Sequence, residues 1–421
     1  MNSKRTLWLA ATTGVAAFAS SEAFAQSVPP PAGEAAPVRP SADFVDLTGS
    51  VGYTGNPFLN SDNSRGSAFG RLSARGVHAW SGERGSSSIT GFVEGTSYLN
   101  HYGVRSIFSV NANTSQQVSE RVRLFGAAGV TGDLSGQLSN RFLYVPPVPE
   151  VPDVTEPPPA TVEDPDLFSF NGRQYRFYGQ GGAAIQTSAR GSVLISGGAQ
   201  RVTYTNSLLN DYTTFFADGS YGYSLSERTT VGFSLGAHRT EYDNSSDHTT
   251  IINPALTVRT RLSEDWNASA AVGVSFAQVD RGPINDNSTN LSLRGSVCHD
   301  SETERLCGRV SRYAQTSATS SLVTTNSVGV DWYKKLDQAQ TIQLSASFVR
   351  YSADEIVGNV VEDNVKTRHL RVAGSYARRI NDRLSGGADV GVRSLHRELA
   401  PDPRTDFTGS VFLRYRLGDL G

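Results

Sequence analysis

The sequence predicts an all-β protein, a transmembrane antiparallel up-and-down β-barrel of about 18 strands (16 to 18), with short periplasmic turns and longer extracellular loops. Three observations predict this class. The chain begins with an export signal, two-faced segments recur at roughly 37-residue intervals, and their apolar faces are rich in small residues. After residue 25, no run reaches the roughly 18 apolar residues of a membrane helix.

Residues 1–25 have the order of a secretory signal peptide. Lys4 and Arg5 precede an apolar run from Leu7 to Ala19, and residues 23–25 read Ala-Phe-Ala, a small-x-small cleavage site. We therefore expect the chain to leave the cytoplasm and to be processed before Gln26.

Three further parts follow the signal. Residues 26–42 are a Pro-rich periplasmic lead, because proline removes backbone donors and disfavours both helix and ladder. This lead is either a solvated spacer or a strap that docks a partner. Residues 43–421 form the predicted outer-membrane barrel, and residues 137–173 are a long Pro-rich loop insertion within it.

The barrel segments alternate apolar and polar residues with period 2, which is typical of strands that have two different faces. The last segment is the clearest, since one face carries Phe407, Gly409, Val411, Leu413, Tyr415 and Leu417. Short turns that resemble Ser226-Glu227-Arg228 lie near residues 83, 120, 189, 227, 264, 302, 337 and 382. Longer polar connections alternate with these turns, at Asn56–Ser67, Asp243–His248, Asp280–Asn287, Ala353–Lys366 and Arg397–Thr405.

Each interval between turns is therefore one hairpin, and the eight turns join sixteen strands. One strand before the first hairpin, near Phe44–Tyr53, and one after the last, near Asp406–Leu417, bring the total to eighteen. An even number returns both ends of the barrel to the same rim, as in bacterial single-chain barrels.

The apolar faces could pack against a second sheet, in a sandwich or propeller, or could face lipid. Lipid is favoured because many of the apolar residues are Ala and Gly, and lipid requires no close packing of bulky side chains. Aromatic residues at strand ends predict two interfacial girdles. One comprises Trp80, Trp266, Trp332 and Tyr333 beside the short turns, and the other comprises Tyr204, Tyr212, Tyr242 and Tyr351 beside the long connections.

The polar faces then line an aqueous interior in which arginine dominates. The predicted pore-lining residues are Arg259, Arg261, Arg294, Arg309, Arg371, Arg393, Arg414, Arg416, Asp218, Asp331 and Asp389. Guanidinium groups stay ionised and bind carboxylate, sulfate or phosphate, so a wide pore of this kind favours anions. Solvated or Asp-paired wall arginines are the alternative interpretation. The phase of the second strand is ambiguous, which leaves Arg71 and Arg75 unassigned.

The two cysteines, Cys298 and Cys307, flank a short hairpin and predict a structural disulfide in an oxidising compartment. The seven histidines have no metal-ligand spacing, and no catalytic residues, metal or cofactor are predicted. We therefore expect the protein not to be an enzyme. A net charge of −2 gives no basic excess for nucleic acid.

The export signal, the Pro-rich lead, the Ser-Glu-Arg turns and the closing strand Phe407–Leu417 together resemble bacterial outer-membrane β-barrel proteins. More narrowly, the chain resembles the β-barrel porin type 2 group, which is associated with exopolysaccharide export in Gram-negative bacteria. One departure is that residues follow the last aromatic, Tyr415, through Gly421, whereas many such barrels end in an aromatic residue.

The resemblance implies a pore in the cell outer membrane for export of an acidic polysaccharide. The implied partners are outer-membrane lipid, the barrel assembly machinery, a periplasmic polysaccharide export protein, and a polysaccharide or small anionic solute, with no nucleic acid. Two other functions stay open: an anion-preferring diffusion porin, and a surface-anchoring or adhesion barrel in which the pore is incidental.

Overall fold

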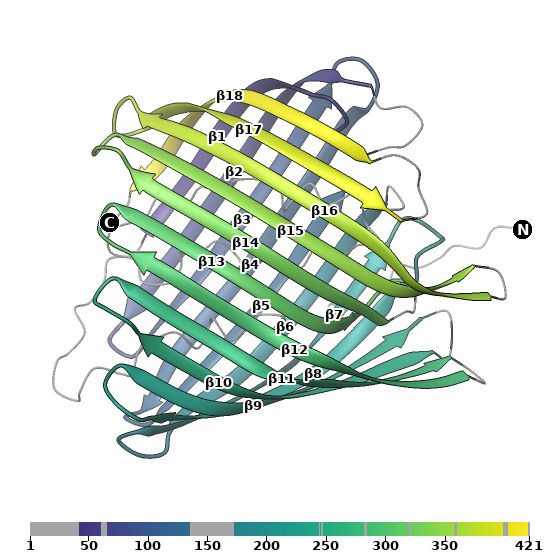
Figure 1. Cartoon of the computed structure of the whole chain (residues 1–421). Helices are drawn as coiled ribbons and strands as arrows, with labels where there is room; N and C mark the ends of the chain where they lie inside the picture. The colour runs from purple at the N-terminus through teal and green to yellow at the C-terminus, as the bar shows by residue number, and fades with distance from the viewer. Residues whose placement is uncertain are drawn as a thin grey trace, which may run out of the picture.

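The computed structural model describes residues 42–59, 65–134, 172–243, 245, 247–281, 284–319, 322–357, 360–398 and 403–419. They form one antiparallel sheet of eighteen strands, and β1 (Ala42–Thr54) pairs with both β2 (Ser67–Gly82) and β18 (Arg404–Asp419), which closes the sheet into a barrel (Figure 1). The predicted fold class and strand number are confirmed. Residues 1–41, and with them the signal and nearly all of the lead, lie outside the described residues, as do residues 135–171 of the insertion.

The remaining strands follow one another around the barrel in chain order. The described residues contain no helix that is long and apolar enough to cross a membrane. The strands between β2 and β18 are β3 (Gly85–Tyr98), β4 (Gly103–Ser119), β5 (Val122–Leu134), β6 (Arg173–Gln186), β7 (Gly191–Tyr204), β8 (Tyr212–Ser224), β9 (Thr229–Tyr242), β10 (His248–Arg261), β11 (Trp266–Arg281), β12 (Ile284–Asp300), β13 (Glu304–Thr316), β14 (Leu322–Lys335), β15 (Gln340–Val357), β16 (Val360–Arg379) and β17 (Leu384–Arg397).

Six of the eight short turns at one rim share a side-chain cap that explains their similar sequences. In the turn after β8, the backbone N–H of Thr229 donates to Ser226 Oγ at 3.1 Å. The side-chain oxygen lies three residues before the first residue of the next strand. It stabilises the turn because it accepts from a backbone N–H that has no partner in the ladder. The same contact, between 2.7 and 3.2 Å, recurs at Ser188, Ser263, Ser301, Asp337 and Asn381.

The Asp337 carboxylate caps one of these turns. The backbone N–H of Ala339 donates to its carboxylate at 2.7 Å, and this bond, with those from Gln340, lowers the pKa of Asp337 below its ordinary 3.8. A depressed pKa stabilises the folded state above pH 3.8, and this contribution is lost as pH falls through the folded pKa. We expect D337N to remove this acid-sensitive part of the unfolding free energy, measured by urea titration at several pH values. Asn381 shows that asparagine builds the same turn, so a D337N curve with unchanged pH dependence would contradict the assignment.

Two of the predicted long connections are much shorter than predicted. Most of Asp280–Asn287 and Ala353–Lys366 continues as strand, since β11 and β12 pair up to Arg281↔Ile284 and β15 and β16 pair up to Val357↔Val360. In Figure 1 the yellow-green β15–β16 hairpin projects beyond its neighbours at the right of the view. The reason is that an antiparallel partner satisfies the backbone whatever the side chains are, so polar residues there do not end the ladder.

The outer surface of the barrel is apolar. Large hydrophobic side chains at alternating positions are exposed on the strands, among them Val45, Leu72, Val93, Leu256, Val330 and Leu413. Trp80 and Trp266 are 43% and 40% exposed beside the short turns, as expected for a girdle at that rim.

The second predicted girdle is wrong. Tyr212 and Tyr242 are buried and pack with Val202, Leu209 and Ala318, with the half-buried Tyr204 against them. Tyr351 is only 2% exposed. These tyrosines occupy the strand phase opposite to the exposed hydrophobic residues, so they point away from the surface that would meet lipid. Tyr333 lies on the same polar phase as Asp331, so it is not part of the first girdle, which consists of the tryptophans.

Candidate functional site: the lumenal wall

Side chains on the polar phase of the strands converge, which identifies that phase as the concave, lumenal side. Tyr178 on β6 donates from its hydroxyl to Asn111 Oδ1 on β4 at 2.7 Å, reaching across Gly129 of the intervening β5. A Cβ on Gly129 would meet both side chains at 2.5 Å, so glycine is what allows them to meet. All eleven residues predicted to line the pore lie on this phase, because the exposed hydrophobic residues of their strands occupy the other.

The closing seam of the barrel carries a row of alternating charges. Arg416 on β18, Asp46 on β1 and Arg75 on β2 are direct register neighbours. Arg416 donates to Asp46 through Nε at 2.6 Å and through Nη2 at 2.7 Å, a bidentate pair in which both side chains are largely buried. One carboxylate therefore lies between two guanidinium groups.

A second row lies nearer the long-loop rim. Arg371 on β16 is opposite Arg393 on β17, which is opposite Asp406 on β18. Arg393 Nη2 donates to Asp406 Oδ2 at 2.9 Å, and both residues are buried. Asp406 Oδ1 also accepts from the Thr54 hydroxyl at 2.7 Å and from the backbone N–H of Asn56 at 2.9 Å. The pair thus holds the chain that leaves β1.

That segment, Gly55–Leu59, enters the lumen. Phe58 is 7% exposed and meets Tyr98 and Tyr102 edge-on, with ring centroids 5.7 and 5.1 Å apart. The Pro57 carbonyl accepts from Arg393 at 2.9 Å. Because Tyr98 lies on the lumenal phase of β3, the segment narrows this side of the mouth.

Between the two rows the wall is hollowed by a cavity of about 150 Å³ that opens into the lumen. Arg71 is 3.3 Å from Glu94 through its Nε, and Arg414 Nε donates to the Thr48 hydroxyl at 3.4 Å. The charged residues that line the cavity are Arg71, Arg75, Arg371, Arg393 and Arg414 with Asp46, Glu94, Asp389 and Asp406. Arg71, Arg75 and Arg393 lie beside Glu94, Asp46 and Asp406 respectively, so these three arginines are partly balanced and do not form isolated, tight anion traps.

The remaining predicted residues lie on the far side of the barrel, away from this cavity. Arg309 donates to Asp331 at 2.6 Å, and Asp218 Oδ1 is 3.9 Å from His238 Nε2. The other three, Arg259, Arg261 and Arg294, are on the lumenal phase of β10 and β12. The structure therefore divides the predicted set between two walls and does not gather it into one site.

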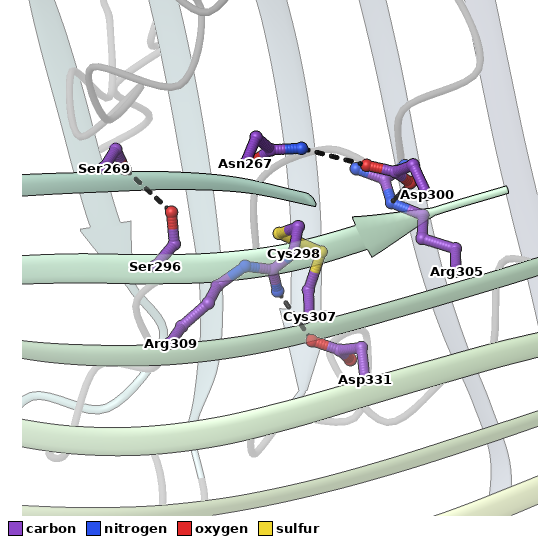
Figure 2. The surroundings of a disulfide bond; sticks show 9 residues. All are labelled: Asn267, Ser269, Ser296, Cys298, Asp300, Arg305, Cys307, Arg309 and Asp331. Atoms are coloured by element: carbon purple, nitrogen blue, oxygen red, sulfur yellow. Dashed lines mark hydrogen bonds and ion pairs between the residues drawn. A yellow bond between two sulfur atoms is a disulfide. The ribbon is translucent and has the colours of Figure 1, made fainter. Parts of the chain in front are cut away.

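The cysteines join neighbouring strands close to Arg309 and Asp331. Cys298 and Cys307 are directly opposite in the β12–β13 register, their Cα atoms are 4.1 Å apart and they are joined by a disulfide (Figure 2). Both are buried on the lumenal phase. A closed loop this short limits the stabilisation to about 3 kcal/mol in the chain-entropy account.

Of the four acidic residues that line the cavity, the predicted pore-lining set contained Asp389 but not Asp46, Glu94 or Asp406. Asp46 follows the alternation of Val45 and Leu47, so the period of the first strand was sufficient to place it. Arg71 and Arg75 were harder, because Gly70, Ala74 and Gly76 occupy most of the outward phase of β2 and give little apolar signal. Glu94 and Asp406 also lie on lumenal phases that exposed neighbours such as Val93 and Phe407 identify.

Among the described residues, no three His, Cys, Asp or Glu side chains are grouped as metal ligands.

No protein-family model and no curated protein matches the chain. The chain is similar to solved structures at low identity. The outer membrane protein OpdK of Pseudomonas aeruginosa is 11% identical with a TM-score of 0.45, covering 89% of this chain and 98% of that one. The FrpB iron transporter of Neisseria meningitidis is 8% identical with a TM-score of 0.46, covering 89% and 81%. The Pseudomonas aeruginosa protein OccK2 in complex with glucuronate is 10% identical with a TM-score of 0.43, covering 90% and 98%.

Proposed function

We propose that this protein is an outer-membrane pore for anionic cargo, and that the cargo is an acidic polysaccharide leaving the cell. The arginine-rich wall across the closing seam carries the proposal. Its guanidinium groups lie on β16, β17, β18 and β2, and the carboxylates among them lie on β17, β18, β1 and β3. The wall thus spans six neighbouring strands. Partly balanced arginines bind anions weakly and repeatedly, and a series of weak sites lets a polymer move where one tight site would hold it.

The location follows the same argument from the outer surface. The closed ring of paired strands satisfies most of the strand backbone, and its exposed hydrophobic side chains need an apolar surrounding. We propose that the strands cross the outer membrane with the short turns in the periplasm.

The inward segment Gly55–Leu59 favours a second cargo class. Because Phe58 fills part of the lumen and Pro57 lines the wall cavity, the mouth on this side suits a small anionic solute as well as a single polymer chain. A diffusion porin for small anions is therefore the second candidate.

Two measurements test the proposal. The mature chain in planar bilayers is expected to conduct with anion preference, and a strain that lacks the gene is expected to release less uronic-acid polymer than the complemented strain. Absence of conductance would contradict any pore function. Anion-selective conductance with unchanged polymer release would reject the export role alone and leave the diffusion porin.

A further inference from the structure

The barrel wall parts between β12 and β13 on the long-loop side. Their pairing runs from Asp300↔Arg305 only to Leu293↔Arg312, although both strands continue. Above that level β12 pairs with β11 as far as Ile284↔Arg281, and β13 pairs with β14 as far as Thr316↔Leu322. Two strands that keep their other neighbours but lose each other must diverge.

The end of β13 turns inward under β10 and β11. The Thr316 hydroxyl is 3.3 Å from that of Thr240 on β9, and the Tyr242 hydroxyl donates to the Ser317 carbonyl at 2.8 Å. Ala314, on the outward phase of β13, is 1% exposed. The outer face of the β13 end is therefore covered by neighbouring strands, while β12 stays outside it.

This divergence leaves a groove of about 780 Å³ on the outside of β13 to β15. The inner face of β12 forms one side through Ser288 and Asn290. Arg312 and Arg350 are its charged residues, and no Asp or Glu is among the described residues that line it. Arg350 Nε is buried without a hydrogen-bond partner, and Arg312 Nη1 donates to Asn326 Oδ1 at 2.8 Å.

The register places two contrasting rows of residues across this part of the outer surface. Arg312, Asn326, Arg350 and Arg368 are successive direct neighbours on β13 to β16. Two residues closer to the short turns, about 7 Å away, the corresponding row is Val310, Val328, Phe348 and Leu370, each more than 40% exposed. From one outward-facing position to the next along these strands, the outer surface thus changes from an apolar row to a row that contains three arginines.

Such a boundary matches an amphipathic anion. Arg350 and Arg368 lie directly opposite each other, and like charges in that position repel. A phosphate between the arginines would remove the repulsion and accept from Arg350 Nε. Acyl chains attached to that phosphate would lie along the valine, phenylalanine and leucine row, where exposed apolar surface already needs lipid.

We propose that this groove, bounded by β12 and the Arg312–Arg350 row, binds the phosphorylated headgroup of an outer-leaflet glycolipid. The inference rests on the proposed membrane location and assigns a lipid site on the outer wall, separate from the lumen. Arg312 and Arg350 lie on the outward phase of their strands, so we expect pore conductance not to depend on either of them.

The test uses the full mature chain in phosphatidylcholine nanodiscs, titrated with a bisphosphorylated lipid A and followed by native mass spectrometry. The R312Q/R350Q double variant is expected to bind the glycolipid at least about tenfold more weakly than the wild type, because two charge-assisted contacts are lost. R239Q is the matched control: Arg239 lies on the outward phase at the same rim but is 53% exposed and paired with Glu241. This control is expected to bind like the wild type.

Further arms identify what is recognised. A dephosphorylated glycolipid is expected to bind no better to the wild type than to the double variant, and excess inorganic phosphate is expected to leave the bound glycolipid in place. Equal binding of lipid A by the wild type and the double variant, or its full displacement by inorganic phosphate, would overturn the site. Heat-modifiable gel migration and unchanged conductance verify that the variants are folded. Failure of the wild type to enter nanodiscs would contradict the membrane proposal itself and the lipid site with it, whereas entry without lipid binding contradicts only the site.

Discussion

D406N is expected to lower the free energy of unfolding by about 3–5 kcal/mol, because it leaves the buried Arg393 without its counter-charge. Asp406 accepts five hydrogen bonds, from the Thr54 hydroxyl, two backbone N–H groups, Arg393 and the Thr408 hydroxyl. An amide can accept on only one atom, so its NH₂ group would face donors. Equilibrium unfolding in urea from lipid vesicles measures the loss.

The same substitution is expected to release the inward segment. Asp406 accepts hydrogen bonds from residues 54 and 56, and Arg393 donates to the carbonyl of residue 57. Loss of the Asp406–Arg393 pair should therefore free this segment, widen the mouth, and raise the open-channel conductance and its noise. D243N is the control, because the Arg201–Asp243 pair is partly exposed and such pairs contribute about 1 kcal/mol or less. If both variants lost the same stability and conducted alike, the anchoring role of Asp406 would be wrong.

The R371E/R414E double variant is expected to lower the anion-to-cation permeability ratio by roughly fivefold or more. Each replacement changes the wall by two charges, and two unit charges contribute about 1 kcal/mol for an ion roughly 7 Å away in water. Arg371 tolerates reversal because it lies opposite Arg393, where a carboxylate would be attracted. Arg416 is unsuitable, since reversal there would place a carboxylate against Asp46.

The reversal potential across a tenfold KCl gradient reports the ratio. R239E is the control, because that side chain projects on the outward phase and its field is screened by salt. A ratio that falls equally in R239E and in the double variant would show that surface charge, and not the lumenal wall, sets selectivity.

The strand count, the short-turn positions and the two faces of most strands were predictable from the sequence because they are local; β2, with Gly70, Ala74 and Gly76 on its outward phase, was the exception. A capped turn such as Ser226–Thr229 has the same chemistry wherever it occurs, and period-2 alternation assigns Arg414 and Leu413 to opposite faces without knowledge of any neighbour. The prediction of the second aromatic girdle failed because nearness to a strand end does not decide which face a side chain occupies. Tyr212 and Tyr242 lie at strand ends, but on the inward phase.

Contacts between distant segments required the tertiary structure. Arg416 and Asp46 are 370 residues apart and meet only because the last strand pairs with the first in one particular register. The parting of β12 from β13 likewise follows from the inward turn of the β13 end against β9, which no local pattern records. Local periodicity determines which way each side chain points, whereas barrel closure and shear determine which side chains meet, because the pairing energy of a ladder depends on the whole ring of strands.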